Sequence, residues 1–199
     1  RINQITSKIP KCLIKINNET ILSRLINQSK ILKIKKVNVI LGYKSKIVQN
    51  YIKKNKFKNI KTHNLDRFKN YNNFFTLYEF RKLLKNKNSF ILFSDLVLDD
   101  NIFRKFKKKR SKQIYLFVDK RKIRKGTMRI SSDSKYLKSI NVKKKQYPNN
   151  GNFIGVAYVP KRKSNLFIKT IEKNYPQLNY DYYTEILNKL ISQKEKIKI

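Results

Sequence analysis

The first half of the chain alternates between segments of helical periodicity and short apolar runs. Three segments carry apolar side chains three and four positions apart, the spacing of amphipathic helices: residues 20–34, 44–54 and 71–84. Three short runs between or after them are apolar or β-branched and predict strands: residues 37–41, 59–64 and 90–93. Helices and strands that alternate at such short spacing indicate a parallel sheet covered by helices on both faces.

The second half has a different pattern. Four strand-like runs follow one another with little helix between them: residues 113–120, 128–133, 136–142 and 152–160. Two helical segments, residues 164–175 and 181–194, then end the chain. Together the halves predict one three-layer α/β/α domain, residues 1–199, with a Rossmann-like, mixed but mostly parallel sheet. The most hydrophobic run, residues 90–93, is expected to be a central strand.

The charge of the chain raises nucleic acid as a partner. Lys and Arg number 49 against 12 Asp and Glu, a formal net charge of +37. However, Lys, Ile, Asn, Tyr and Phe are enriched together, and all five have codons made only of A and T, so a compositional drift explains the lysines. One dense basic run, residues 103–112, is typical of a solvated helix face and a turn. We therefore expect no specific nucleic-acid partner, and keep a basic nucleic-acid-binding module as the alternative.

The rare residues exclude other classes of site. Cys12 is the one cysteine, which excludes an internal disulfide, and its apolar surroundings predict a small buried side chain. His63 has no second His or Cys with which to share a metal. No apolar run approaches the roughly 20 residues of a membrane-spanning helix. Oligomeric state is not indicated by any pattern.

A carboxylate follows the strand predicted at residues 90–93. Ligands of open α/β sheets bind outside the carboxyl ends of the strands, where Asp95 would lie. If Asp95 is buried beside apolar neighbours, it requires a cation, and Mg²⁺ suits a single carboxylate when phosphate oxygens complete its ligands. The alternative is that Asp95 caps the following helix, near Asp99 and Asp100. On position alone, neither interpretation is favoured.

The opening stretch, RINQITSKIPKCLI, resembles the signature of the nucleotidylyltransferases that act on sugar 1-phosphates and on phosphocholine, G-x-G-T-R-[LI]-x-x-[LI]-T-x-x-x-P-K-x-L. Seven residues fall at the spacing of this motif: Arg1, Ile2, Ile5, Thr6, Pro10, Lys11 and Leu13. The stretch NNFFTLYEFRKLLKNKNSFILFSDLVLDD is similar to the family segment that ends in a metal-binding aspartate, with Asp95 at that position. The blocks YNNFFTLY, GTMRISSD and GNFIGVAYV most resemble the phosphocholine branch.

The resemblance implies a nucleotide-diphospho-sugar transferase-like fold and an enzyme that transfers a nucleoside monophosphate from a triphosphate. It implies that Lys11 and Arg1 are catalytic and bind the nucleotide, that Asp95 holds Mg²⁺, and that Asn72 and Asn73 contact the nucleotide. For Asn72 and Asn73 a helix-capping role is equally favoured, since Asn precedes an apolar-periodic run. The favoured substrates are CTP and a phosphocholine-like phosphate monoester or phosphonate, in a cytoplasmic enzyme; a sugar 1-phosphate is the alternative acceptor.

Two departures from the family pattern stand at the ends of the chain. The glycines that should precede Arg1 are not present, and no acidic W-x-[ED]-type segment follows near the C-terminus. Glu185 is a weak candidate for the second metal-binding carboxylate that such a segment would supply. We therefore expect this chain to be truncated at both ends and impaired as an enzyme by itself.

Overall fold

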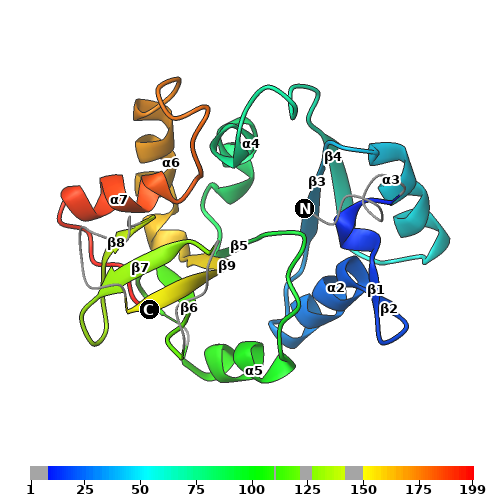
Figure 1. Cartoon of the computed structure of the whole chain (residues 1–199), viewed down its shortest axis with the longest axis horizontal. Coiled ribbons are helices and arrows are strands. Elements are labelled where there is room, and N and C mark those ends of the chain that lie inside the picture. The colour runs from blue at the N-terminus through cyan, green and yellow to red at the C-terminus, as the bar shows by residue number, and fades with distance from the viewer. Residues whose placement is uncertain (1–8, 110, 122–126, 142–149) are drawn as a thin grey trace. The chain divides into compact units, whose positions relative to one another are not determined.

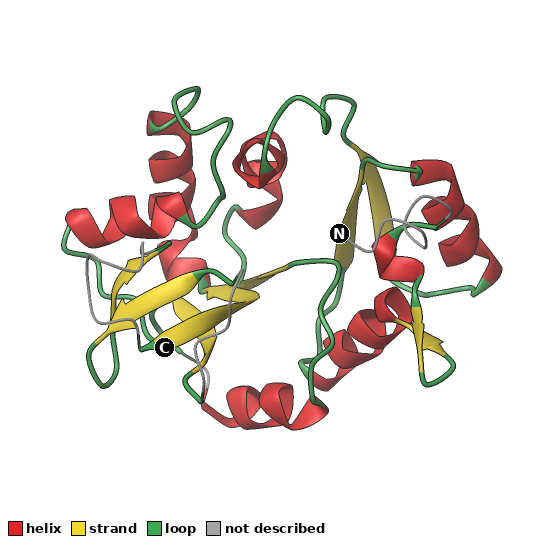
Figure 2. Cartoon of the chain, in the orientation of Figure 1, coloured by secondary structure: helices red, strands yellow, loops and turns green. Residues whose placement is uncertain are grey.

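The computed structural model describes residues 9–109, 111–121, 127–141 and 150–199, as helices, strands and connecting loops (Figures 1 and 2). The chain divides into two compact units, Arg1–Phe68 with Phe93–Arg110, and Lys69–Leu92 with Ser111–Ile199. Within the described ranges, no helix is both long enough and apolar enough to cross a membrane.

The first unit is built around two parallel strands and three helices. Its elements are the short 3₁₀ helix η1 (Lys11–Leu13), the strands β1 (Lys15–Ile16), β2 (Glu19–Thr20), β3 (Val37–Leu41) and β4 (Ile60–Asn64), and the helices α2 (Ile21–Ile31), α3 (Ser45–Lys54) and α5 (Asp100–Lys109). β3 and β4 pair in parallel, from Val37 opposite Ile60 to Leu41 opposite Asn64 (Figure 1). The connection between them is α3, as in a βαβ unit.

The core of the first unit joins the opening turn to α2 and to β3. It contains Leu13 of η1, Leu22 and Ile26 of α2, Leu41 of β3 and Val48 of α3. The helical spacing of the apolar residues in α2 therefore buries one face of that helix, as predicted. Cys12 is half-buried and packs against this core, which is less burial than the sequence predicted.

The β1–β2 hairpin was not predicted from the apolar pattern, because both strands are only two residues long. Lys15 pairs with Thr20 and Ile16 with Glu19. The two residues of the turn, Asn17 and Asn18, have φ angles of 50° and 65°. Positive φ at both positions is the conformation of a type I′ hairpin turn, and Asn tolerates it better than most residues. The dipeptide Asn17-Asn18 was thus the available signal.

The second unit consists of a sheet built around one long strand and of helices that pack on it. The strands are β5 (Ser89–Leu92), β6 (Tyr115–Asp119), β7 (Arg129–Ser132), β8 (Leu137–Ile140) and β9 (Gly151–Val159), and the helices are α4 (Asn73–Phe80), the 3₁₀ helix η2 (Arg81–Leu84), α6 (Lys161–Lys173) and α7 (Glu185–Ser192). β9 pairs antiparallel with β5, β6 and β7, and β7 pairs antiparallel with β8. Eight of the nine residues of β9 are buried, which explains its continuous apolar sequence.

The predicted mixed α/β fold is confirmed, but antiparallel pairing is more extensive than the sequence suggested. Among the named strands, parallel pairing is found between β3 and β4, whereas the pairings around β9 are antiparallel. Residues 90–93 were expected to form a central strand, but in the order β5-β9-β7-β8 of the described strands β5 stands at the end and pairs with β9, which has several partners. An apolar run predicts that both faces of a strand are buried, but it does not predict how many strands pair with it. A single domain over residues 1–199 stays a prediction.

Candidate functional site

Lys11 and Asp95 form an ion pair in the first unit. The distance from Lys11 Nζ to Asp95 Oδ2 is 3.5 Å, and the two side chains are 52% and 45% exposed. Two of the predicted site residues, far apart in the sequence, are therefore brought together by the fold. Both charged groups remain open to solvent, so a ligand can reach either of them.

The backbone before Lys11 explains how its side chain is held. Pro10 has φ −59° and ψ 142°, and its carbonyl accepts a hydrogen bond of 2.9 Å from the amide of Leu13. The amide of Ile14 donates to the carbonyl of Lys11 at 3.1 Å, which closes the short η1 turn. Since the proline ring fixes φ and Leu13 is buried in the core, Lys11 projects from a turn anchored on both sides.

Asp95 is positioned by the same helix that packs against Leu13. Three hydrogen bonds from α2 meet at the carbonyl of Leu98: Arg24 donates from Nε at 3.2 Å and from Nη2 at 3.1 Å, and Gln28 donates from Nε2 at 2.8 Å. Gln28 Nε2 also donates to Asp100 Oδ1 at 2.8 Å. α2 thus supports both Lys11, through Leu13, and the loop that carries Asp95.

Arg24 and Gln28 are positioning residues that sequence reasoning missed. Gln28 is only 2% exposed, although it is polar and bonds to a loop distant in sequence. It lies seven positions after Ile21, on the apolar side of α2, where a core residue would be expected. A glutamine within an apolar helical stripe was the signal for a buried polar contact.

The sequence-based view of Asp95 requires two corrections. Asp95 is exposed rather than buried, because β5 ends at Leu92 and Asp95 lies in the turn that follows. The helix-capping role belongs to Asp99, whose Oδ1 accepts a hydrogen bond of 2.7 Å from the amide of Asn101 at the start of α5. The carboxylate of Asp95 therefore does not act as the cap of α5.

Cys12, which neighbours Lys11, is kept protonated by its surroundings. Burial of the thiol, together with the nearby negative charge of Asp95, raises the pKa of Cys12 to about 11. A thiol with this pKa is almost entirely neutral near pH 7, so it is poorly suited to act as a nucleophile. Its role here is to pack against the core beneath Lys11.

Asn72 and Asn73 lie in the second unit and fix a loop to the start of α4. Asn72 caps α4, since its Oδ1 accepts from the amide of Asn73 at 2.8 Å. Asn73 Oδ1 accepts from the amide of Tyr183 at 2.7 Å, and the amide of Asn72 donates to the carbonyl of Asn179 at 3.0 Å. The capping interpretation is confirmed for Asn72. A contact of either side chain with a nucleotide stays a prediction.

Glu185 and Arg1 complete the predicted site residues. Glu185 begins α7 in the second unit, where Oε1 accepts from Nδ2 of Asn141 and Oε2 accepts from Nδ2 of Asn188 at 2.9 Å. The carboxylate therefore ties the end of β8 to α7, and its role as a metal ligand stays a prediction. Arg1 lies outside the described residues.

The chemistry around Asp95 is compatible with Mg²⁺. In the part of the chain that the structure describes, no group of three or more His, Cys, Asp or Glu side chains gathers at one place. A closed, all-protein metal cage is thus not formed by these residues. Mg²⁺ commonly binds one or two carboxylates and takes its other ligands from substrate phosphates and water. The exposed carboxylate of Asp95 fits that mode.

Comparison with known proteins relates the fold to one class of enzyme. No family model and no curated protein matches the sequence. Among solved structures, the chain is similar over 100% of its length to 82% of a CTP:phosphocholine cytidylyltransferase from Streptococcus pneumoniae, with a TM-score of 0.81 and 20% identity. It is similar, also over its full length, to 84% of a UDP-glucose pyrophosphorylase, with a TM-score of 0.75 and 12% identity.

A third solved structure extends the comparison to another acceptor. The inositol-1-phosphate CTP transferase of T. maritima matches 98% of this chain over 77% of its own length, with a TM-score of 0.74 and 12% identity. Two of the three proteins are named for CTP and one for UDP-glucose, their printed names give different acceptors, and the chain matches the fold of each. The chain therefore has the fold of nucleotidylyltransferases, the class that its opening motif resembles.

Proposed function

We propose that this chain is the catalytic part of a nucleotidylyltransferase, which transfers a nucleoside monophosphate from a triphosphate to a small phosphate monoester or phosphonate. The observation that carries the proposal is the 3.5 Å Lys11–Asp95 pair, which joins the lysine of the opening motif to the aspartate that follows β5. A fold match alone does not establish activity, since one fold hosts many functions. Here the fold match coincides with a cation and a carboxylate suited to phosphate chemistry.

The reaction brings two anions together. An oxygen of the acceptor phosphate attacks the α-phosphorus of the triphosphate, a new P–O bond forms, and the bond from the α-phosphorus to its bridging oxygen breaks to release pyrophosphate. Lys11, exposed and held on a rigid turn, offsets the negative charge of both reactants as they meet. Asp95 would hold Mg²⁺, which when bound neutralises part of the triphosphate charge.

The remaining site residues have narrower roles in the proposal. Arg1 binds the departing pyrophosphate, since a guanidinium matches phosphate oxygens with a planar pair of donors. Asn72 and Asn73 contact the base or the ribose through side-chain amides that remain near the start of α4. Glu185 is the weakest member, because both of its oxygens accept amide hydrogen bonds within its own unit.

CTP and a phosphocholine-like acceptor are the substrates that we favour. The blocks YNNFFTLY, GTMRISSD and GNFIGVAYV resemble the phosphocholine branch, and the identity to the phosphocholine enzyme is 20% against 12% to the UDP-glucose enzyme. In the second unit Tyr180 is 73% exposed, and its ring lies 5.5 Å from that of Tyr71. Exposed aromatic faces attract quaternary ammonium groups. The proposed location is the cytoplasm, where such nucleotides are available.

A screen of pyrophosphate release tests this function. The full-length protein is assayed with Mg²⁺ and each of four nucleoside triphosphates, against phosphocholine, a phosphonate and several sugar 1-phosphates. We expect turnover with CTP and phosphocholine or its analogue. Turnover only with a sugar 1-phosphate would reject phosphocholine as the acceptor, but it would still agree with a nucleotidylyltransferase. No release with any pair, alongside salt-sensitive RNA binding, would favour the nucleic-acid-binding alternative.

The distribution of exposed cations favours the enzyme over a basic nucleic-acid-binding module. Exposed Lys or Arg side chains lie on α3 and α5 of the first unit and on α6 of the second. They are found on helices of both units and are not confined to the dense run at residues 103–112. Such a spread is the result expected from a lysine-rich composition, which raises non-specific affinity for any polyanion.

A further inference from the structure

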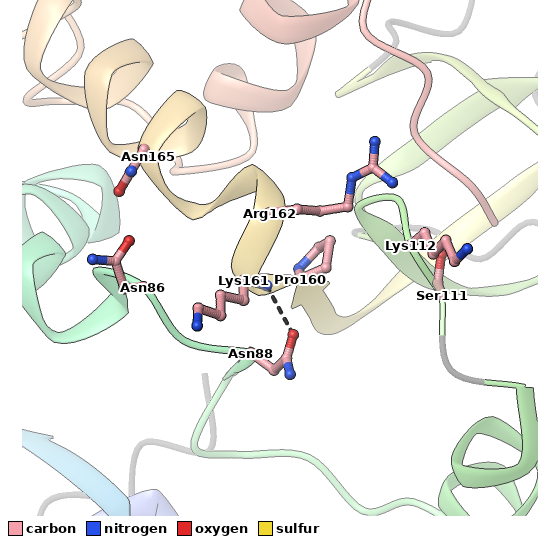
Figure 3. Close-up of a pocket in the computed structure, with 8 residues that line it drawn as sticks. All are labelled: Asn86, Asn88, Ser111, Lys112, Pro160, Lys161, Arg162 and Asn165. Atoms are coloured by element: carbon pink, nitrogen blue, oxygen red, sulfur yellow. Dashed lines mark hydrogen bonds between the residues drawn. The ribbon is translucent and has the colours of Figure 1, made fainter.

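An open hollow in the second unit gathers cations and side-chain amides. Its volume is about 500 Å³, and Lys112, Lys161 and Arg162 line it together with Asn86, Asn88 and Asn165 (Figure 3). The residues come from three parts of the chain: the loop before β5, the loop before β6, and Pro160 with the first turns of α6. Seven of the eight lining residues are polar or charged, and the hollow is open to solvent.

Within the described ranges, the cations that face this hollow are in no ion pair. Among the described residues, no carboxylate forms an ion pair with Lys112, Lys161 or Arg162. Lys163, the next residue of α6, differs: its Nζ lies 2.7 Å from Glu195. In the first turn of α6, Lys163 is thus paired with Glu195 and does not line the hollow, whereas Lys161 and Arg162 line it.

The residues that line the hollow belong to the second unit, whereas Lys11 and Asp95 belong to the first unit. In the antiparallel pairing of β5 with β9, Ser89 lies opposite Val159 and Leu92 opposite Val156. The hollow therefore lies where β5 begins and β9 ends, beside Asn88 and Pro160. Asp95 follows the other end of β5 along the chain, and Lys11 pairs with it there. The hollow therefore shares no lining residue with the Lys11–Asp95 pair.

The rim of the hollow is held in place by hydrogen bonds that use Asn88. Its Oδ1 accepts from the amide of Lys161 at 2.8 Å and from the hydroxyl of Tyr158 at 3.2 Å. This contact fixes the first residue of α6 against the loop before β5 (Figure 3). The backbone that carries Lys161 and Arg162 is therefore ordered without a ligand.

The cations are distributed on two sides of the hollow. In Figure 3, Arg162 extends toward Lys112, whereas Lys161 extends toward Asn86 on the opposite side. A planar guanidinium binds phosphate with paired donors, and a lysine acts as a point charge. We propose that this hollow is a second anion site, which binds a small molecule with two phosphate groups, one near Arg162 and Lys112 and one near Lys161.

Calorimetric titration with inorganic pyrophosphate at about 0.15 M salt tests the proposal, since this ionic strength screens exposed charges beyond roughly 8 Å. We expect Arg162→Ala to weaken binding to the hollow about tenfold, the effect of losing one charge-assisted contact. Lys169→Ala, an exposed change farther along α6, is the matched control and should leave affinity within about twofold. Equal effects of the two changes would overturn the proposal.

The titration also separates this site from the proposed function. Lys11→Ala should leave pyrophosphate binding at the hollow unchanged, because Lys11 belongs to the other unit and does not line the hollow. If Lys11→Ala abolishes all pyrophosphate binding, the anion binds only at the transfer site and the second site does not exist. Acetylation of the unaltered protein gives an independent measurement: pyrophosphate should protect Lys112 and Lys161 but not Lys169, and equal labelling of all three would contradict the proposal.

Discussion

The ammonium of Lys11 lies 3.5 Å from the carboxylate of Asp95, and both groups are about half exposed. One follows the proline of the opening turn, and the other follows the strand β5. The contact is weak as a source of stability, because exposed ion pairs contribute about 0–1 kcal/mol. In the proposed function, the two groups are the charges that the phosphates and Mg²⁺ would engage.

Replacement of Lys11 tests its part in the transfer. Lys11→Ala should lower kcat/KM about 10²–10³-fold, the usual effect of removing one preorganised charge from a transition state. Because that charge matters most when both anions meet, kcat should fall more than the affinity for the acceptor. Lys53→Ala, an exposed change in the last turn of α3, is the charge-matched control. Equal and small effects would show that Lys11 is an ordinary surface lysine.

Asp95→Asn should separate activity from stability. The change keeps the shape of the side chain and removes the charge that would hold Mg²⁺, so Mg²⁺-dependent pyrophosphate release should be lost. The free energy of unfolding should change by less than about 1 kcal/mol, because the ion pair to Lys11 is exposed. Urea unfolding and a magnesium titration of the rate measure the two quantities. A variant that keeps full activity would exclude Asp95 as the metal ligand.

The reactivity of the Cys12 thiol tests whether the charge of Asp95 lies nearby, and its measurement does not require enzyme activity. Since burial and Asp95 raise its pKa to about 11, Cys12 should react with iodoacetamide at pH 8 at least about tenfold more slowly than in the unfolded chain. Asp95→Asn removes a negative charge that disfavours the thiolate, so the pKa of Cys12 should fall and the reaction should become faster. An unchanged rate in Asp95→Asn would mean that this carboxylate is not near Cys12.

The start of α2 offers a prediction about stability. Thr20 caps this helix, with Oγ1 accepting from the amide of Ser23 at 3.1 Å, and it also bonds the hydroxyl of Tyr51 at 2.9 Å. Thr20→Ala removes both contacts in a buried place and should lower the free energy of unfolding by about 1–2 kcal/mol. Thr20→Ser retains the hydroxyl and should recover most of this loss. Equal destabilisation by Ser and Ala would show that the hydroxyl is not the stabilising group.

The periodicity of the sequence predicted the elements well, and the tertiary structure decided how they pair. The run at residues 37–41 is β3 without any shift in its ends, and the helix predicted at residues 44–54 is α3, Ser45–Lys54. These features depend on neighbours within one or two turns. By contrast, the antiparallel pairing of β5 with β9 joins segments far apart in the chain, and an apolar run does not specify its partner or its direction.

For the site, the sequence determined which residues to examine, through the motif that contains Pro10 and Lys11 and through the carboxylate after β5. Only the tertiary structure brought Lys11 to Asp95, left Asp95 exposed, and showed that Arg24 and Gln28 anchor its loop through the carbonyl of Leu98. The physical reason is that exposure and side-chain contact are set by packing between distant segments. Local spacing carries information on which face of an element is apolar, but not on what covers that face.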